Sequence, residues 1–140
     1  MMHSQVRRGD IVIFDFGSGI GSVQGGIRPA IVLQNDKQNL RSPTTIIAPL
    51  TSKTSKKRFM AAHVAVGTEF GLLYDSQILI EQLRTVNQDS LLGDPIGHVN
   101  DEQIIKAINH GLCMTLGIPL FPTNTCASNQ EDTTTTFTDS

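Results

Sequence analysis

Short runs of apolar and β-branched residues, each followed by a turn-forming or polar segment, make up most of the first 86 residues. Such runs are typical of strands in small antiparallel β-structures. The run at 76–86 (SQILIEQLRTV) is compatible with a strand, a helical turn or both. The sequence therefore predicts a mainly β domain, a small barrel or a sandwich. The clearer strands are expected at 9–16 (GDIVIFDF), 28–35 (RPAIVLQN), 44–51 (TTIIAPLT) and 61–66 (AAHVAV), with loops or turns at 17–26, 36–43 and 52–60.

The segment that follows Asn100 has apolar residues at helical spacing instead. Asn100 is a candidate N-cap, and Gln103 lies three residues further on, as in a capping box. Gly117 and Pro119 are expected to end the helix. One amphipathic helix closing a β-barrel is the simplest architecture that accommodates this pattern. The apolar stripe consists of Ile104, Ile105, Ile108, Leu112 and Leu116.

The chain is expected to form one folded domain followed by a tail. Its 140 residues suit a single domain, and a chain of this size buries roughly two thirds of its unfolded surface without needing disulfides. The barrel domain is predicted to span 1–118. From 119 to 140 the composition becomes polar and threonine-rich, which predicts disorder.

Positive charge is concentrated in one part of a chain whose net charge is −2. A local basic face of this kind can attract phosphates although the molecule as a whole is nearly neutral. A solvated lysine-rich loop explains the same charges equally well. Between residues 28 and 58 the cations are Arg28, Lys37, Arg41, Lys53, Lys56, Lys57 and Arg58, against the single acid Asp36.

Several kinds of site find no support in the sequence. The two cysteines and four histidines are scattered, so no metal site is predicted. GSGIGS (17–22) is neither a dinucleotide-binding fingerprint nor a P-loop, and no serine or cysteine lies in a nucleophile elbow. No cofactor is therefore expected. The sequence has no apolar signal core and no membrane-length apolar run, which predicts a cytoplasmic protein.

Arg28 and Thr51 are the candidate site that remains. If the second and third strands pair as a meander, the start of one and the end of the next meet at one edge of the sheet. An arginine there can hold phosphate oxygens in a fork and offset developing charge, and a threonine hydroxyl can donate to the same oxygens. The alternative is that Arg28 pairs with an acid and Thr51 simply ends a strand.

Five blocks of the sequence resemble the MazF/PemK family of endoribonuclease toxins, in matching order and spacing across roughly residues 8–117. The Gly-Gly-x-Arg-Pro and Pro-Leu-Thr-Ser segments are the most specific. The resemblance implies an SH3-like barrel with a C-terminal helix, a homodimer, metal-independent cleavage of single-stranded RNA, a cognate antitoxin and, through that antitoxin, an indirect contact with DNA. The blocks are RRGDIVIFDF, GSVQGGIRPAIVLQND, SPTTIIAPLTS, HVAV and DSQILIEQLRTV.

The resemblance also assigns roles to residues. The family's catalytic arginine corresponds to Arg28 and its threonine or serine to Thr51, while the Gln-x-Arg segment corresponds to Gln82 and Arg84, near the RNA groove and dimer interface. Many members carry Glu where this chain has Val23, which leaves the general base unassigned. Further RNA-binding residues are expected at Gln24, Gly25, Gly26, Ser52, Lys53, Lys56, Lys57 and Arg58.

The absence of a recognisable nucleophile in the sequence fits a reaction in which the RNA's own 2′-hydroxyl attacks the adjacent phosphorus. The products would be a 2′,3′-cyclic or 3′-phosphate and a 5′-hydroxyl. Two alternatives remain open at this level. One is a non-catalytic RNA- or peptide-binding SH3-like module, and the other is an inactive toxin relative that acts as a regulator.

Overall fold

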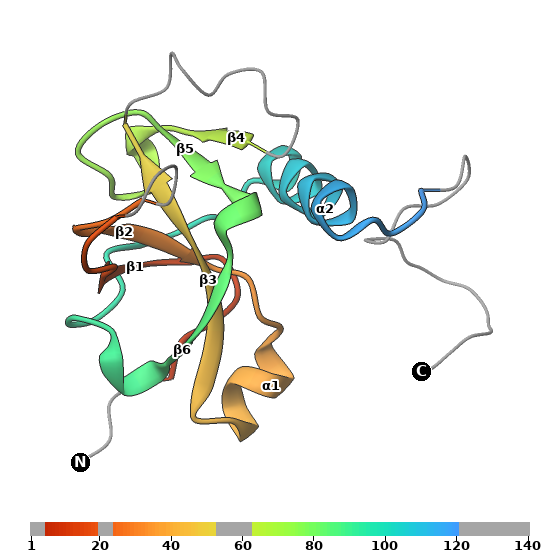
Figure 1. The fold of residues 1–140 in the computed structure, drawn as a ribbon. Helices are drawn as coiled ribbons and strands as arrows, with labels where there is room; N and C mark the ends of the chain where they lie inside the picture. The colour runs from red at the N-terminus through yellow and green to blue at the C-terminus, as the bar shows by residue number, and fades with distance from the viewer. Residues whose placement is uncertain (1–4, 20–23, 53–62, 121–140) are drawn as a thin grey trace.

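The computed structural model describes residues 5–19, 24–52 and 63–120, and these form a curled β-structure with a helix at its C-terminal end (Figure 1). The mainly β fold class predicted from the sequence is confirmed, and the arrangement is compatible with an SH3-like barrel. In chain order the elements are β1 (Asp10–Asp15), β2 (Ile27–Val32), α1 (Asp36–Arg41), β3 (Thr44–Thr51), β4 (His63–Val66), η2 (Thr68–Phe70), β5 (Ser76–Leu79), η3 (Ile80–Gln82), β6 (Arg84–Asn87), η4 (Gln88–Ser90), β7 (Gly97–His98) and α2 (Glu102–Leu116).

The strands of the described residues form one antiparallel sheet in the order β4-β5-β3-β2-β1-β7, with β6 also paired to β3. β3 lies at its centre. One edge of β3 pairs with β2, while the other pairs first with β6 and then, at Leu50 and Thr51, with β5. Figure 1 shows β3 running through the middle of the molecule, with α1 beside its start and α2 beside the β4 side of the sheet. A single strand therefore connects all parts of the sheet.

Both faces of the sheet carry apolar cores, because strands such as β1 have apolar residues at consecutive positions. The core on the α2 side contains Ile11, Ile31, Leu50 and Ile78 from the sheet and Ile108 from the helix. The core on the other face, here called the opposite core, consists of Val6, Val12, Phe14, Phe16, Ala30, Val32, Ile47 and Val86.

Residues 36–43, predicted as a polar turn, contain the short helix α1. That expectation was wrong because a side-chain cap and a buried side chain stabilise the helix, and composition shows neither of them. Asn35 Oδ1 caps it by accepting a hydrogen bond from the Gln38 N–H at 2.8 Å. Asn39, only 1% exposed, accepts hydrogen bonds at Oδ1 from Gln34 Nε2 and Thr45 Oγ1. A buried amide with these partners anchors the helix against the sheet.

The segment 76–86 combines both structures that its sequence allows. β5 ends at Leu79, the turn η3 follows, and β6 begins at Arg84. Glu81 in the turn is held by β4, since His63 Nε2 and Glu81 Oε2 share a hydrogen bond of 3.0 Å. The turn separates two strands that both run antiparallel to β3: β5 pairs with Leu50 and Thr51, and β6 pairs with residues 44–47.

The C-terminal helix is present where periodicity predicted it, but its N-cap is Asp101 rather than Asn100. Asp101 Oδ1 accepts hydrogen bonds from the N–H groups of Gln103 at 2.8 Å and Ile104 at 3.1 Å. The difference arises because β7 still pairs with β1 and the Val99 N–H still donates to the Gly9 carbonyl, which delays the start of the helix. The helix ends as predicted at Gly117, whose φ of 72° is left-handed. Among the described residues, no helix has the length and apolarity needed to cross a membrane.

We expect Asp101→Ala to lower the free energy of unfolding by about 1 kcal/mol, because two N–H groups of the first helical turn lose their acceptor. Asn100→Ala is the matched control, since Asn100 is exposed and precedes the cap. Chemical denaturation of both variants tests this. Equal losses, or a larger loss for Asn100→Ala, would contradict the assignment of the cap to Asp101.

Candidate functional site

β2 and β3 bring Arg28 and Thr51 to the same end of the sheet, and the predicted pairing of these two strands is confirmed. Ala30 lies opposite Pro49 and Val32 opposite Ile47. The same register, continued by two residues, places Arg28 opposite Thr51. Directly opposed residues of an antiparallel pair share a face, so Arg28 and Thr51 lie on the face of the opposite core.

Two main-chain carbonyls hold the guanidinium group of Arg28 in place. Its Nε donates to the Gly25 carbonyl at 2.9 Å, and its Nη1 donates to the Leu50 carbonyl at 3.2 Å. The side chain is half-buried. A guanidinium has five N–H donors, so three have no partner among the residues that the structure describes. The described residues do not support the alternative that Arg28 pairs with an acid, because both groups that accept its hydrogen bonds are main-chain carbonyls.

Thr51 is the last residue of β3 and is only 3% exposed. Its register partner on the other side is Gln77 of β5. Because Thr51 is covered, a ligand phosphate could contact its hydroxyl only after a local rearrangement at this end of β3. Ser52, the next residue, is exposed.

Two glycines shape the loop that leads to Arg28. The Gly26 N–H donates to the Gly17 carbonyl at 2.7 Å, with a φ of 84° at Gly26 that favours glycine. A side chain at Gly25 would place its Cβ 2.7 Å from the Gly17 carbonyl oxygen, which is too close. The close approach that these glycines permit is thus between the two ends of the loop. This close approach positions the Gly25 carbonyl, which accepts the hydrogen bond from Arg28 Nε.

The same loop is tied to η3 through Gln82. The Gln82 Oε1 accepts a hydrogen bond from the Gln24 N–H at 2.8 Å. Gln82, 58 residues from Gln24 in sequence, therefore forms one connected unit with the loop and Arg28. The sequence placed Gln82 near the site only through the family resemblance.

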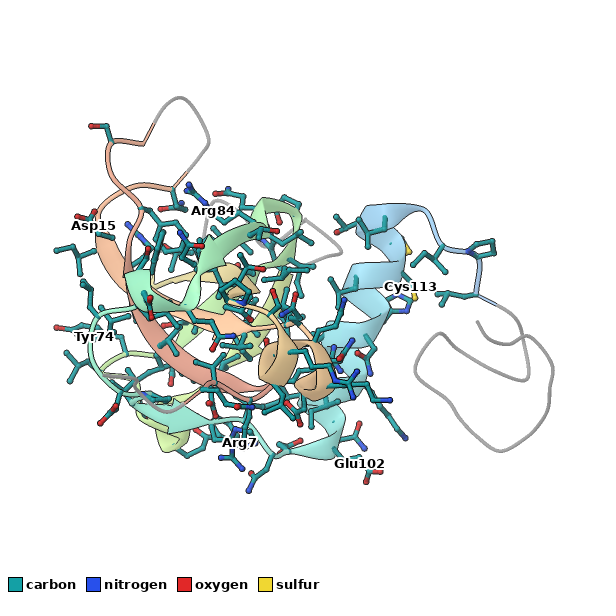
Figure 2. All side chains as sticks on the ribbon, turned by 90° about the horizontal axis from the view of Figure 1, so that it is seen from below. Arg7, Asp15, Tyr74, Arg84, Glu102 and Cys113 are labelled. Atoms are coloured by element: carbon teal, nitrogen blue, oxygen red, sulfur yellow. The ribbon has the colours of Figure 1, made fainter. Side chains whose placement is uncertain are left out.

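Arg84 lies over two aromatic rings on the same face. Its guanidinium carbon is 5.7 Å from the centre of the Phe14 ring and 5.6 Å from that of Phe16, within cation–π range. The two rings contact each other edge to face, with centroids 4.8 Å apart. Figure 2 shows Arg84 on the same side of the molecule as Asp15, at the end of β1. This aromatic pair was not among the residues predicted from the sequence, although the spacing of FDF in a strand indicates two rings on one face.

Lys53, Lys56, Lys57, Arg58 and Val23 lie outside the described residues. The described residues contain no group of three or more histidine, cysteine or acidic side chains that could hold a metal ion.

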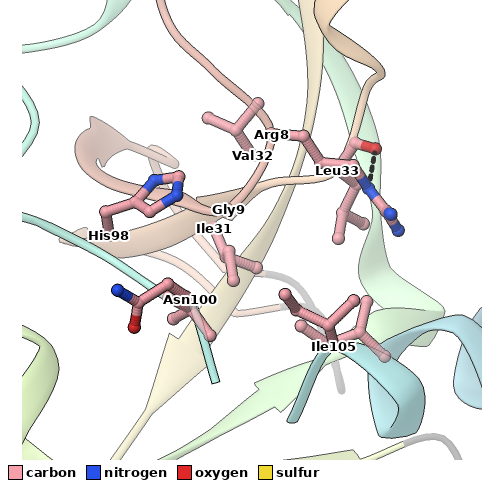
Figure 3. Close-up of a pocket in the computed structure, with 10 residues that line it drawn as sticks. Arg8, Gly9, Ile31, Val32, Leu33, His98, Asn100 and Ile105 are labelled. Carbon is pink, nitrogen blue, oxygen red and sulfur yellow. Dashed lines mark hydrogen bonds between the residues drawn. The ribbon is translucent and has the colours of Figure 1, made fainter. Parts of the chain in front are cut away.

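A cavity of about 220 Å³ lies elsewhere, between the sheet and the start of α2 (Figure 3). Ile31, Ile105 and Ile108 give it apolar walls, and Arg8 and His98 lie at its polar part. Arg8 is structural there: its Nε donates to the Leu33 carbonyl at 2.9 Å and its Nη2 to Asn109 Oδ1 at 2.7 Å. Burial lowers the pKa of Arg8 from its usual value, and the nearby charge of Asp36 opposes that shift. None of the predicted site residues lines this cavity.

The chain is similar to known proteins over most of its length. Residues 7–116 match the family described as PemK-like, MazF-like toxin of type II toxin-antitoxin system. The Endoribonuclease EndoA of Bacillus subtilis is 39% identical over 114 residues, which cover 81% of this chain and 96% of that protein. The crystal structure of MazF (Form-I) from Deinococcus radiodurans superposes with a TM-score of 0.69 at 21% identity, covering 83% of this chain and 100% of the other.

A second solved structure has the same fold. It is an endoribonuclease in complex with its cognate antitoxin from Mycobacterial species, with a TM-score of 0.67 and 24% identity, covering 81% of this chain and 97% of that one. The family match spans more than half of the chain, including every described residue discussed above as part of the site. This chain therefore belongs to the PemK/MazF family of toxins of type II toxin–antitoxin systems.

Proposed function

We propose that this protein is an endoribonuclease toxin that cuts single-stranded RNA at specific sequences without a metal ion. The observation that carries the proposal is the juxtaposition of Arg28 and Thr51 at one end of the sheet in a chain that matches the toxin family over residues 7–116. A relative 39% identical is named an endoribonuclease, which supports the same reaction class.

In the proposed reaction, the ribose 2′-oxygen attacks the adjacent phosphorus and loses its proton to the surrounding water, which returns a proton to the leaving group. A bond from the 2′-oxygen to phosphorus forms, and the bond from phosphorus to the 5′-oxygen breaks. The 5′-oxygen leaves with the electron pair and takes up a proton, giving a 2′,3′-cyclic phosphate and a 5′-hydroxyl. The tethered nucleophile gains effective molarity, up to roughly 7–11 kcal/mol in well-oriented cases.

Arg28 suits the electrostatic part of this reaction. A guanidinium remains protonated in proteins, so its role is to hold non-bridging oxygens and offset their developing charge. The bonds to the Gly25 and Leu50 carbonyls hold it before RNA arrives. Donors aligned in advance need no reorganisation during the reaction, and that is the source of their catalytic effect. Thr51 would donate its hydroxyl to the same phosphate after the local rearrangement at the end of β3 that exposes it.

The residues around this pair would bind the rest of the RNA. Arg84, stacked on Phe14 and Phe16, supplies a second cation on the same face. Gln82 would also hold the loop that carries this site, since its Oε1 accepts the hydrogen bond from the Gln24 N–H. The proposed RNA-binding set is Gln24, Gly25, Gly26, Ser52, Lys53, Lys56, Lys57, Arg58, Gln82 and Arg84.

Replacing either central residue should reduce cleavage strongly. We expect Arg28→Ala and Thr51→Val each to slow cleavage by about 10²–10³-fold, the usual effect of losing a donor to a developing oxyanion. Arg28→Lys should recover little, because an ammonium cannot reproduce the fork. Rates on a long RNA, with melting temperatures to show that the variants fold, measure this.

Lys106→Ala is the control, because it removes an exposed cation on α2, away from Arg28. It should cut RNA at the wild-type rate. Wild-type activity in Arg28→Ala would contradict the site. Retention of RNA by the wild-type protein without cleavage would favour a binding module or an inactive toxin relative.

The reaction should require the 2′-hydroxyl and not a metal. An RNA with one deoxyribose immediately 5′ of the scissile phosphate should bind but remain intact, because its nucleophile is missing. Excess EDTA should leave cleavage of the all-ribose RNA unchanged. End analysis should find 5′-hydroxyl products. Cutting of the deoxy substrate, or loss of activity in EDTA, would overturn this mechanism.

The proposal includes two protein partners. The solved complex of a structural relative with its cognate antitoxin supports an antitoxin for this chain. A homodimer is the second, because cyclic pairs are the commonest assembly of small proteins. Sedimentation at micromolar concentration should give about twice the chain mass of 15.2 kDa, and a monomer would contradict this part of the proposal.

A further inference from the structure

The strand register places a row of side chains across the face that carries Arg28. Phe14 lies opposite Arg28, and Arg28 lies opposite Thr51 when the β2–β3 register is continued. Thr51 pairs with Gln77, and Gln77 pairs with Ala65. Because directly opposed residues share a face, all five belong to one row. Ala65 is exposed, so the face is open at that end of the row.

Gln77 is the unusual member of the row. Its neighbours along β5, Ser76 and Ile78, are buried, whereas Gln77 is half-buried on the face of Arg28. Its side-chain oxygen, Oε1, is removed from solvent and accepts no hydrogen bond. An unsatisfied buried acceptor lowers stability, and such groups in native proteins call for an explanation. An apolar side chain would fit this position in a strand without that cost.

Position and chemistry together suggest what the oxygen accepts. Two strand spacings of about 4.8 Å separate Gln77 from Arg28, so the two Cα atoms lie about 10 Å apart. A nucleotide adjoining a phosphate held by Arg28 can span that interval. The terminal torsion of a glutamine side chain is broad, so the amide can turn toward a ligand at little cost. Every RNA base carries at least one N–H donor, and each ribose carries an O–H donor.

We propose that Gln77 is a specificity residue: its Oε1 accepts a hydrogen bond from an N–H or O–H donor of a nucleotide next to the scissile phosphate. The inference rests on the proposed ribonuclease function and adds to it the residue that selects the cleavage sites. Thr51 lies between Gln77, which would contact the neighbouring nucleotide, and Arg28, which would contact the scissile phosphate. The unpaired oxygen in the free protein is then satisfied when RNA binds.

The test compares Gln77→Met with wild type, because methionine keeps the length of the side chain and removes the acceptor. Both proteins cut a long RNA of mixed sequence, and the new 5′-hydroxyl ends are sequenced. We expect the variant to lose discrimination at one position beside the cut by about 10- to 100-fold, as for one base-edge contact. Gln103→Met, at an exposed position in the first turn of α2, is the matched control and should leave the cleavage pattern unchanged.

The melting temperature distinguishes recognition from a structural role. Gln77→Met should melt at the same temperature as wild type or higher, because the unsatisfied oxygen is gone. Substrates then identify the donor. Removing a base N–H, or replacing one ribose by deoxyribose away from the scissile linkage, should slow wild type but not Gln77→Met at the position concerned.

Three outcomes would overturn the inference. If Gln77→Met cuts at the same sites with the same preferences, Gln77 does not read RNA, while the ribonuclease function stands. If the variant melts lower and loses activity equally on all sites, its role is structural. If wild type cuts no RNA, the proposed function fails and the role of Gln77 fails with it.

Discussion

β3 is hydrogen-bonded along both of its edges, and the rest of the molecule depends on that double pairing. One edge carries β2 and therefore Arg28, while the other carries β6 and β5 and therefore Arg84 and Gln77. A shift of one residue in any of these pairings would turn every side chain of that strand to the other face. The buried residues on both faces of β3 resist such a shift. Burial of apolar side chains thus fixes which polar groups meet at the end of the sheet.

The guanidinium of Arg28 illustrates how this framework positions a charge. Its two acceptors are main-chain carbonyls, one from the preceding loop and one from the neighbouring strand. Neutral carbonyls hold the group without neutralising it, in contrast to a carboxylate, which would compete with a phosphate. The loop itself is closed by Gly17 and Gly26 and tied to η3 by Gln82. The position of Arg28 therefore depends on three separate segments of the chain.

Much of the fold could be predicted because it follows from local patterns. Alternating and continuous apolar runs indicated β1, β2 and β3, and the helical spacing of Ile104, Ile108 and Leu112 indicated α2. Where prediction failed, side-chain contacts and strand pairing decided the structure. α1 forms in a polar segment because Asn39 reaches buried partners on Gln34 and Thr45. The helix cap moved from Asn100 to Asp101 because β7 still pairs with β1.

The candidate site, like the fold, was predictable from the sequence only in part. By itself the sequence determined that strands would present Arg28 and Thr51 at their ends, because strand periodicity and turn spacing are local properties of the chain. It also showed the Gly-Gly-x-Arg-Pro segment by which the chain resembles its family. Only the tertiary structure decided that Gln82 would hold the loop, that Arg84 would lie on Phe14 and Phe16, and that the unpaired oxygen of Gln77 would share a row with Arg28. Those neighbours come together through strand pairing over long sequence separations, and neither composition nor periodicity contains the register of that pairing.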